Sequence, residues 1–526
     1  MDFGLSRALE QRVSEELGPG TRHKDAPFHF GLLYPSPYRA AMSSLGYLQI
    51  QRLLARRPLT RVERATLPDP EQIEIHRRTR TPLLSLESRR PVSECHLIGI
   101  SHAYELELAG LATCFELMGL PPLAKDRSAE HPLVIAGGPI TFSNPLPTSA
   151  FAEVVLMGEA EETLSLLMDR LERDPEAARG SASKRRALLE ELAGMPGFYV
   201  PEHHGLYLPK IASAEADLPA VSAIWTPNTE LHDMVLVEPE RGCHRGYTFC
   251  VMRRSTNGGM RIFDIERTLA AIPEGATRVG LVGAAVSDHP EIKSLLRALI
   301  EERGLEIGIS SLRADRLDDE FVRLLAKGGY RSMTVALDAA SARLRVEIEK
   351  NLPNRHVHAA AELARAHGMR HLKVYVMLGL PEETDEDIEE LIAFSLSLRK
   401  ILPVKLGVSP FVPKFHTPLA DAPFAGEARA AELLDRLKRK LSGKVEVRGP
   451  SAREAWVESR LAQGGPEHAQ AAIAVSQAGG GLGAWRRALR DLPERVRPTN
   501  FSELVPLSSR ARRLAVREAR LPAEAS

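Results

Sequence analysis

Apolar strands that alternate with helix-length segments are the feature that most restricts how this chain can fold. In the first third of the sequence, mainly apolar segments lie at residues 28–35, 96–103, 132–138 and 153–158. Amphipathic segments of helical length lie between or after them, beginning with residues 40–57. Strands without alternating polar residues are buried on both faces, so this order predicts a parallel sheet covered by helices on both sides.

The same order returns in the second half of the chain and predicts a second parallel sheet. Its apolar segments lie at residues 234–239, 277–283, 305–312, 331–338, 371–380 and 404–413. Consecutive strand–helix units of similar length favour a curved sheet or partial barrel, with the chemistry at the carboxyl ends of the strands. We therefore expect an α/β protein with a Rossmann-like parallel sheet, a partial (β/α)6 barrel and a helical C-terminal region.

The length of the chain, 526 residues, indicates more than one domain, because single hydrophobic cores stop growing at roughly 250–300 residues. We expect an N-terminal domain over residues 1–172 and a connector over 173–230. The barrel is expected over residues 231–440, and a helical extension over 441–526.

Charge and cysteine content exclude several classes of protein. The formal net charge is zero, which argues against a dedicated nucleic-acid binder. No apolar run approaches the roughly 18 residues of a membrane helix, and residues 1–20 lack the apolar stretch of a signal peptide. We therefore expect a cytoplasmic protein without membrane contact. In such a compartment, the closely spaced Cys243 and Cys250 indicate a metal or redox site rather than a disulfide.

The loop around these two cysteines predicts the chemistry most directly. It follows the first strand of the second sheet and reads RGCHRGYTFC over residues 241–250. This layout resembles the radical S-adenosylmethionine superfamily, whose signature is CxxxCxxC after that strand. In that family three thiolates hold a four-iron four-sulfur cluster, and the amino and carboxylate groups of S-adenosylmethionine chelate the fourth iron.

The loop matches this signature at three positions and departs from it at one. Cys243 matches the first cysteine and Cys250 the third, so the resemblance implies that both bind iron. Phe249 matches the aromatic residue that lies against the adenine in the family. Tyr247 stands in place of the middle cysteine.

Three interpretations of Tyr247 remain open. In the first, the cluster has another third ligand, either a residue from elsewhere or the Tyr247 phenolate, whose free pKa of about 10 must fall for it to bind iron. In the second, the site holds a weaker or smaller cluster. In the third, the chain keeps the fold without the redox chemistry.

The resemblance extends over residues 232–420 and implies further contacts with S-adenosylmethionine. The family has a Gly-Gly-Glu element after the second strand that meets the methionyl amino group. Here Gly283 is followed by Ala284 and Ala285, so the small residues are present and the carboxylate is absent. The polar residues that follow, near Asp288, serve equally well as a helix cap.

Two later strand ends carry the remaining candidate cofactor contacts. Ser311 and Arg313 follow the third strand and suit a ribose or a carboxylate. Asp338 and Arg343 match positions after the fourth strand, and the alternative is a helix start with a solvated Arg343.

Two features near the end of the barrel complete the match. The turn GLPEET at residues 379–384 is typical of relatives of the methylthiotransferases and of cobalamin-domain enzymes. Its acidic residues cap a helix and are therefore structural. Lys414 and His416 follow the sixth strand and are expected to point towards a substrate opening.

The N-terminal region resembles the cobalamin-binding module that precedes the barrel in one branch of the superfamily. The resemblance lies in AGGPITFSNP at residues 136–145 and MGEAEETL at 157–164. The loop after the first strand, residues 34–47, contains no histidine, which argues against cobalamin held through a cobalt-binding histidine. A base-off form of cobalamin without a protein ligand stays open, and a retained scaffold or substrate platform is the favoured role.

The resemblance implies a protein that binds S-adenosylmethionine and an iron–sulfur cluster. If active, it would receive an electron from flavodoxin or ferredoxin and modify an unknown substrate through a 5′-deoxyadenosyl radical. No catalytic residue is assigned, because reaction type does not follow from the fold. The alternative is a catalytically degenerate binding or regulatory module for a nucleotide, RNA or a protein. The arginines between Trp485 and Arg520 give RNA weak support and suit a solvated helix face equally well.

Overall fold

The computed structural model describes residues 2–21, 24–252, 259–310 and 312–506. Its first half is built on a six-stranded sheet of order β2-β1-β3-β4-β5-β6, parallel except between β5 and β6. These strands are β1 (Phe28–Tyr34), β2 (Thr60–Thr66), β3 (Leu97–Ser101), β4 (Leu133–Gly137), β5 (Val154–Leu156) and β6 (Phe198–Tyr199). The four apolar segments expected here are confirmed as β1, β3, β4 and β5.

Helices cover both faces of this first sheet, as the apolar strands predict. One face carries α3 (Leu45–Arg56), α7 (Glu161–Arg173) and α9 (Ala182–Ala193), whose leucines share a core with β1. The other face carries α5 (Leu108–Met118). The other helices of this half are α1 (Phe3–Ser14), α2 (Tyr38–Ala41), α4 (Pro70–Thr79), α6 (Leu146–Ser149), α8 (Pro175–Ala178) and α10 (Pro201–His204).

The second half is a curved parallel sheet, and all six expected strands are confirmed. Its first part has the order β11-β10-β7 and its second part the order β12-β13-β14-β15, with one parallel bridge from Leu312 to Val335 between them. The strands are β7 (Met234–Val237), β10 (Arg278–Leu281), β11 (Glu306–Ile309), β12 (Ser332–Asp338), β13 (His371–Leu378), β14 (Val404–Pro410) and β15 (Glu446–Arg448).

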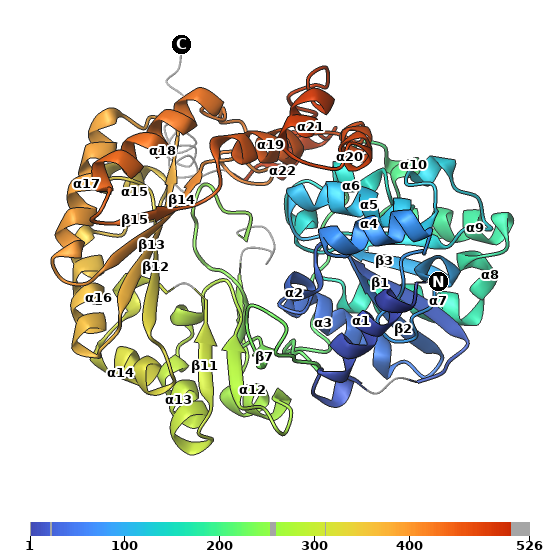
Figure 1. The fold of residues 1–526 in the computed structure, drawn as a ribbon, viewed down its shortest axis with the longest axis horizontal. Coiled ribbons are helices and arrows are strands. Elements are labelled where there is room, and N and C mark those ends of the chain that lie inside the picture. The colour runs from blue at the N-terminus through green and yellow to red at the C-terminus, as the bar shows by residue number, and fades with distance from the viewer. Residues whose placement is uncertain (1, 22–23, 253–258, 311, 507–526) are drawn as a thin grey trace, which may run out of the picture.

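The helices of the second half lie on the convex side of this sheet, so its concave side faces the first domain (Figure 1). They are α12 (Ile265–Ala271), α13 (Ile292–Arg297), α14 (Asp319–Lys327), α15 (Ala342–Glu347), α16 (Asn354–Ala366), α17 (Asp385–Arg399) and α18 (Glu427–Leu441). A short antiparallel hairpin, β8 (Glu240–Gly242) and β9 (Met260–Ile262), follows β7. Among the described residues, no helix is both long and apolar enough to cross a membrane.

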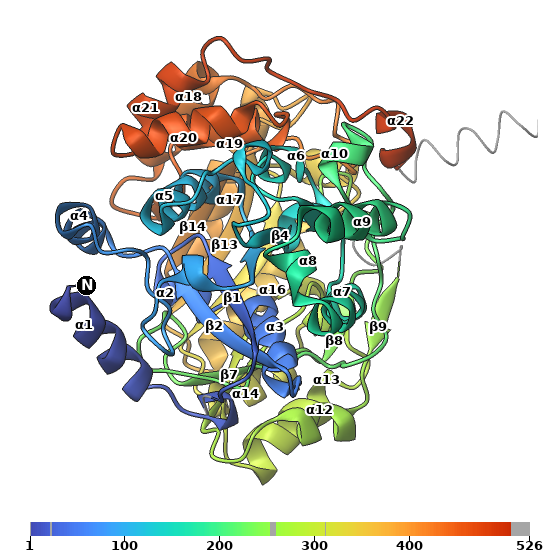
Figure 2. The ribbon, with the colours of Figure 1, turned by 90° about the vertical axis from the view of Figure 1, so that its right-hand side faces the viewer.

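The C-terminal region is helical, as expected, and it returns to the first domain. Its helices are α19 (Ala452–Ala462), α20 (His468–Gln477), α21 (Leu482–Ala488) and α22 (Phe501–Leu504). Figure 2 shows α20 beside α5, and residues of α19, α20 and α21 share the core of that face of the first sheet. The hydroxyls of Thr113 and Ser476 lie 2.7 Å apart across this contact.

Strand β2 is the main element that the sequence analysis missed, because its residues are charged. Arg64 lies within β2 and is 1% exposed. Its guanidinium binds Glu16 at 2.6 Å and also pairs with Glu87. The paired charges allow a charged strand to occupy a buried position.

Residues of the expected connector also take part in the first sheet. Strand β6 pairs with β5, and Leu188, Leu189 and Leu192 of α9 lie in the core. The domain boundaries at residues 172, 230 and 440 stay predictions.

Candidate functional site

The hairpin of β8 and β9 fixes the start of the cysteine loop at the carboxyl end of β7. Gly242 of β8 pairs with Met260 of β9, and Cys243 follows directly. Gly242 has a φ of 96°, a conformation that favours glycine and turns the chain into the loop. Cys243 is buried, with 9% exposure, and Cys250 is half-buried.

Both cysteines are thiols unless a cation binds them. Burial raises the pKa of Cys243 above its usual range. Burial raises the pKa of Cys250 to about 11, and the negative charge of an ionised Cys243 adds to that rise. The Cys243 Sγ accepts a hydrogen bond from the Arg245 amide at 3.4 Å. A bound metal would supply the positive charge that keeps both as thiolates.

Tyr247 lies between two cations instead of facing an open metal position. Its oxygen accepts a hydrogen bond from the Arg313 guanidinium. The Lys350 Nζ lies 4.6 Å from the centroid of its ring, a cation–π geometry. The rings of Tyr247 and Phe249 stack on each other, with centroids 5.7 Å apart and ring planes at 9°.

The structure brings several of the expected cofactor contacts together around Tyr247. Arg313 is also paired with Asp315 at 2.8 Å. Asp338 accepts from Lys350 at 2.6 Å and has a φ of 66°, at a shift in the register between β12 and β13. Each of these charges is therefore already paired within the protein. Ser311 lies outside the described residues, and its role stays a prediction.

Gly283 lies behind the loop, against a residue that the sequence analysis missed. A Cβ atom at this position would lie 2.1 Å from the Glu240 Oε1. That same oxygen accepts a hydrogen bond from the Ala285 amide at 2.8 Å. Burial raises the pKa of Glu240 to about 7. Glu240 and Lys350 belong to no motif, so the sequence carried no signal for either residue.

Ion pairs tie the loop to the strands around it. Arg245 binds Asp288 through two nitrogens, at 2.8 and 2.6 Å, and Arg316 binds the same carboxylate at 2.9 Å. The side chain of Asp288 is fully buried. Asp288 therefore holds the loop in position against the end of β10.

Three expectations from the sequence change with the structure. Arg343 pairs with Asp387, and Ser341 caps α15, which favours the helix-start interpretation over a cofactor contact. Lys414 does not point into an opening, because it binds Glu105 at 2.6 Å and Glu458 at 2.7 Å. His416 is fully buried, so it does not reach solvent at an opening either.

The loop provides two cysteines, Cys243 and Cys250, where the cluster of the radical S-adenosylmethionine family is held by three. Among the described residues, no three His, Cys, Asp or Glu side chains converge on a metal position. The third place belongs to Tyr247, whose oxygen is bound by Arg313. The residues present therefore do not fit the arrangement of three thiolates, although the two sulfur atoms fit iron.

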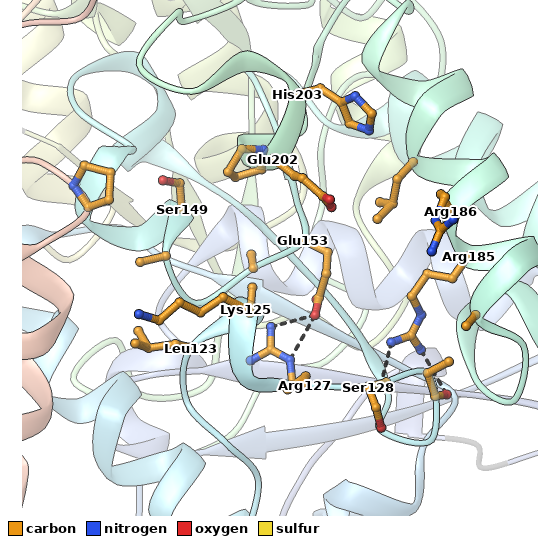
Figure 3. Close-up of a pocket in the computed structure, with 18 of the residues that line it drawn as sticks. Leu123, Lys125, Arg127, Ser128, Ser149, Glu153, Arg185, Arg186, Glu202 and His203 are labelled. Carbon is orange, nitrogen blue, oxygen red and sulfur yellow. Dashed lines mark hydrogen bonds and ion pairs between the residues drawn. The ribbon is translucent and has the colours of Figure 1, made fainter.

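A separate cavity of about 910 Å³ lies on the first domain, away from the loop (Figure 3). Two of the arginines that line it are bound to other groups of the protein. Arg127 binds Glu153 at 3.0 Å, and Arg185 donates to the His131 carbonyl at 2.7 Å. No residue of the cysteine loop lines this cavity.

Two family descriptions match the chain and define its class. Residues 46–201 match the family described as radical SAM proteins, N-terminal. Residues 237–395, which include the cysteine loop and β7 to α17, match the radical SAM superfamily. The chain belongs to the radical S-adenosylmethionine superfamily, as its loop and barrel predict.

Individual relatives cover different shares of the chain. An uncharacterized protein of Methanocaldococcus jannaschii is 31% identical over 307 residues, which are 56% of this chain and 63% of that protein. The chain thus spans less than two thirds of the relative's length.

The comparison with solved structures gives matches of low sequence identity. The methyltransferase TsrM of Kitasatospora setae, solved with cobalamin and a four-iron four-sulfur cluster, has a TM-score of 0.49 and 13% identity, covering 89% of this chain and 98% of TsrM. The cobalamin-dependent enzyme OxsB, solved with aqua-cobalamin and S-adenosylmethionine, has a TM-score of 0.47 and 15% identity, covering 80% of this chain and 56% of OxsB.

Proposed function

We propose that this protein binds S-adenosylmethionine and an iron–sulfur cluster at the carboxyl ends of β7 and β10, with Cys243 and Cys250 as iron ligands. The observation that carries the proposal is the position of the two cysteines: Cys243 is buried directly after the pairing of Gly242 with Met260, and Cys250 is half-buried in the same loop. Soft sulfur ligands select iron–sulfur clusters. The substrate and the type of reaction do not follow from this site.

The surrounding residues support a role in binding the nucleoside part of the cofactor. Phe249 offers an aromatic surface stacked on Tyr247, whose oxygen binds Arg313. Asp338 pairs with Lys350, which lies over the Tyr247 ring. We assign the contacts with S-adenosylmethionine to Phe249, Gly283, Arg313 and Asp338. Since the third iron position lacks a thiolate, no catalytic step is derived through the cluster.

Anaerobic reconstitution tests this proposal. Iron and sulfide are counted per chain, and the reduced protein is examined by electron paramagnetic resonance. We expect iron in the wild type and its loss in the Cys243→Ser and Cys250→Ser variants. Cys114 lies buried in α5 and is distant in sequence from the loop, so Cys114→Ser is the matched control. An iron content near zero in the wild type, unchanged by these substitutions, contradicts the proposal.

The second candidate is a binding or regulatory module that keeps the fold without a cluster. The hydrogen bond from Arg313 to the Tyr247 oxygen favours it, because the oxygen that stands in place of the third thiolate is already bound to a guanidinium. The Tyr247→Cys variant separates the two candidates. A large gain in iron content shows that tyrosine replaced a ligand that was needed, and unchanged or lower iron content identifies the tyrosine as compatible with the natural site.

Reduction by a flavodoxin or ferredoxin, binding of RNA and a role for cobalamin stay predictions. The arginine-rich stretch from Trp485 onward is described only as far as residue 506. Residues 34–47, where the resemblance would place a cobalt-binding histidine, form α2 and the beginning of α3.

A further inference from the structure

Glu240 is a buried carboxylate with one oxygen that receives no hydrogen bond from the described residues. The residue is fully buried in β8. Its Oε1 accepts from the Ala285 amide at 2.8 Å, and its Oε2 has no partner. A buried acceptor without a donor is costly, and such groups in native proteins usually meet a ligand or an ordered water molecule.

The cations near Glu240 are already bound to other carboxylates. Arg241, the next residue, binds Glu238 at 2.7 Å, Glu161 at 2.8 Å and Glu159 at 3.3 Å. Among the described residues, Glu240 makes no ion pair with a lysine or an arginine. When ionised, its carboxylate therefore needs a positive group from outside the protein.

A cavity at Glu240 has room for such a ligand. Its volume is about 510 Å³, within the range of small-molecule sites. It lies between the carboxyl ends of the first sheet and the start of the barrel. Apolar side chains such as Phe30, Leu32 and Ile135 line one side, and Glu240, Gly283 and Ala284 line the other.

We propose that Glu240 accepts a hydrogen bond from the α-amino group of S-adenosylmethionine in this cavity. The assignment rests on the proposed function and supplies a carboxylate where the segment from Gly283 to Ala285 offers none. An N–H group of the amine donates to an ionised carboxylate in a strong, charge-assisted hydrogen bond. Gly283 is needed for this geometry, because a side chain there would displace the Glu240 carboxylate.

Glu383 provides a matched control. Its Oε1 accepts from the Gly379 amide at 2.7 Å, and its Oε2 is buried without a partner among the described residues. Burial raises the pKa of Glu383 to about 7, as it does for Glu240. Glu383 does not line the cavity, so its substitution tests the loss of a similar carboxylate elsewhere in the barrel.

The experiment is calorimetric titration of the full chain with S-adenosylmethionine and with 5′-methylthioadenosine, which lacks the amino-acid group. We expect Glu240→Gln to weaken binding of S-adenosylmethionine at least tenfold and to change binding of 5′-methylthioadenosine less than twofold. Gly283→Ala should act in the same direction, and Glu383→Gln should change neither ligand. An unchanged affinity in Glu240→Gln, an equal loss for both ligands, or a wild type that binds no S-adenosylmethionine overturns the proposal.

Iron content, measured on the same samples, separates this proposal from the proposed function. A chain that takes up iron but binds S-adenosylmethionine independently of Glu240 contradicts only the role of Glu240. A chain without iron whose binding still depends on Glu240 contradicts only the cluster.

Discussion

The raised pKa of Glu240 predicts how the stability of the protein depends on pH. The pKa rises from 4.5 in an exposed carboxyl to about 7 in the folded protein, and burial is the main cause. This rise corresponds to roughly 3 kcal/mol in the free energy of unfolding. The folded state binds the proton more tightly than the unfolded state. The stabilising contribution is therefore complete below pH 4.5 and is lost as the pH rises through 7.

Replacing Glu240 by glutamine removes this titration and keeps the size of the side chain. Effects of the substitution on packing do not depend on pH. A change between two pH values in the difference in free energy of unfolding between variant and wild type therefore reports on the Glu240 carboxyl group alone. We expect the stability of Glu240→Gln relative to the wild type to increase by about 2 to 3 kcal/mol between pH 5 and pH 8.

Urea unfolding at both pH values, without ligand and followed by tryptophan fluorescence, measures this difference. Trp225 is buried in the core of the barrel and reports on its unfolding. A stability difference between variant and wild type that is the same at pH 5 and pH 8 refutes the reasoning, because Glu240 would then titrate like an exposed carboxyl. A bound cation at Glu240 would also reduce the difference, so added S-adenosylmethionine is expected to diminish it.

Three further substitutions test the packing described above, each by urea unfolding at neutral pH. Arg64→Leu leaves the Glu16 carboxylate buried without its partner and should cost about 3 to 5 kcal/mol, more than Arg78→Leu on the surface of α4. Lys414→Met similarly leaves the carboxylates of Glu105 and Glu458 without their shared cation and should cost about 3 kcal/mol, and an effect below 1 kcal/mol would contradict a shared buried ion pair. Arg80→Gly should stabilise the chain by up to about 1 kcal/mol, because Arg80 ends α4 with a φ of 52°.

The sequence predicted elements whose local pattern already contains the reason for their burial. Strands such as β4 and β13 are apolar over their whole length or on one face, and the turn after β13 contains its own capping residues, Thr384 and Asp387. Strand β2 lacks such a pattern, because its partners Glu16 and Glu87 come from other segments. Charge pairing over such distances is visible only in the folded chain.

Some residues of the candidate site could likewise be predicted from the sequence, and others could not. A motif with fixed spacing identified Cys243, Tyr247 and Cys250. Glu240 and Lys350 became candidates only through their contacts in the folded chain. Glu240 accepts a hydrogen bond from Ala285, about 45 positions away, and Lys350 lies over the ring of Tyr247, about 100 positions away. The return of the C-terminal helices to α5 was likewise unpredictable, because Thr113 and Ser476 form their contact across 363 residues.

The position of the cysteine loop and its metal chemistry depend on different residues. Arg241 binds carboxylates from both halves of the chain, and Arg245 binds the buried Asp288, so ion pairs hold both sides of Cys243. Tyr247 fills the middle position with an aromatic ring and receives its hydrogen bond from Arg313. The loop can therefore keep its shape without a third thiolate. A cysteine at position 247 would enter a loop whose backbone is already in place, which is why Tyr247→Cys is expected to change iron content far more than stability.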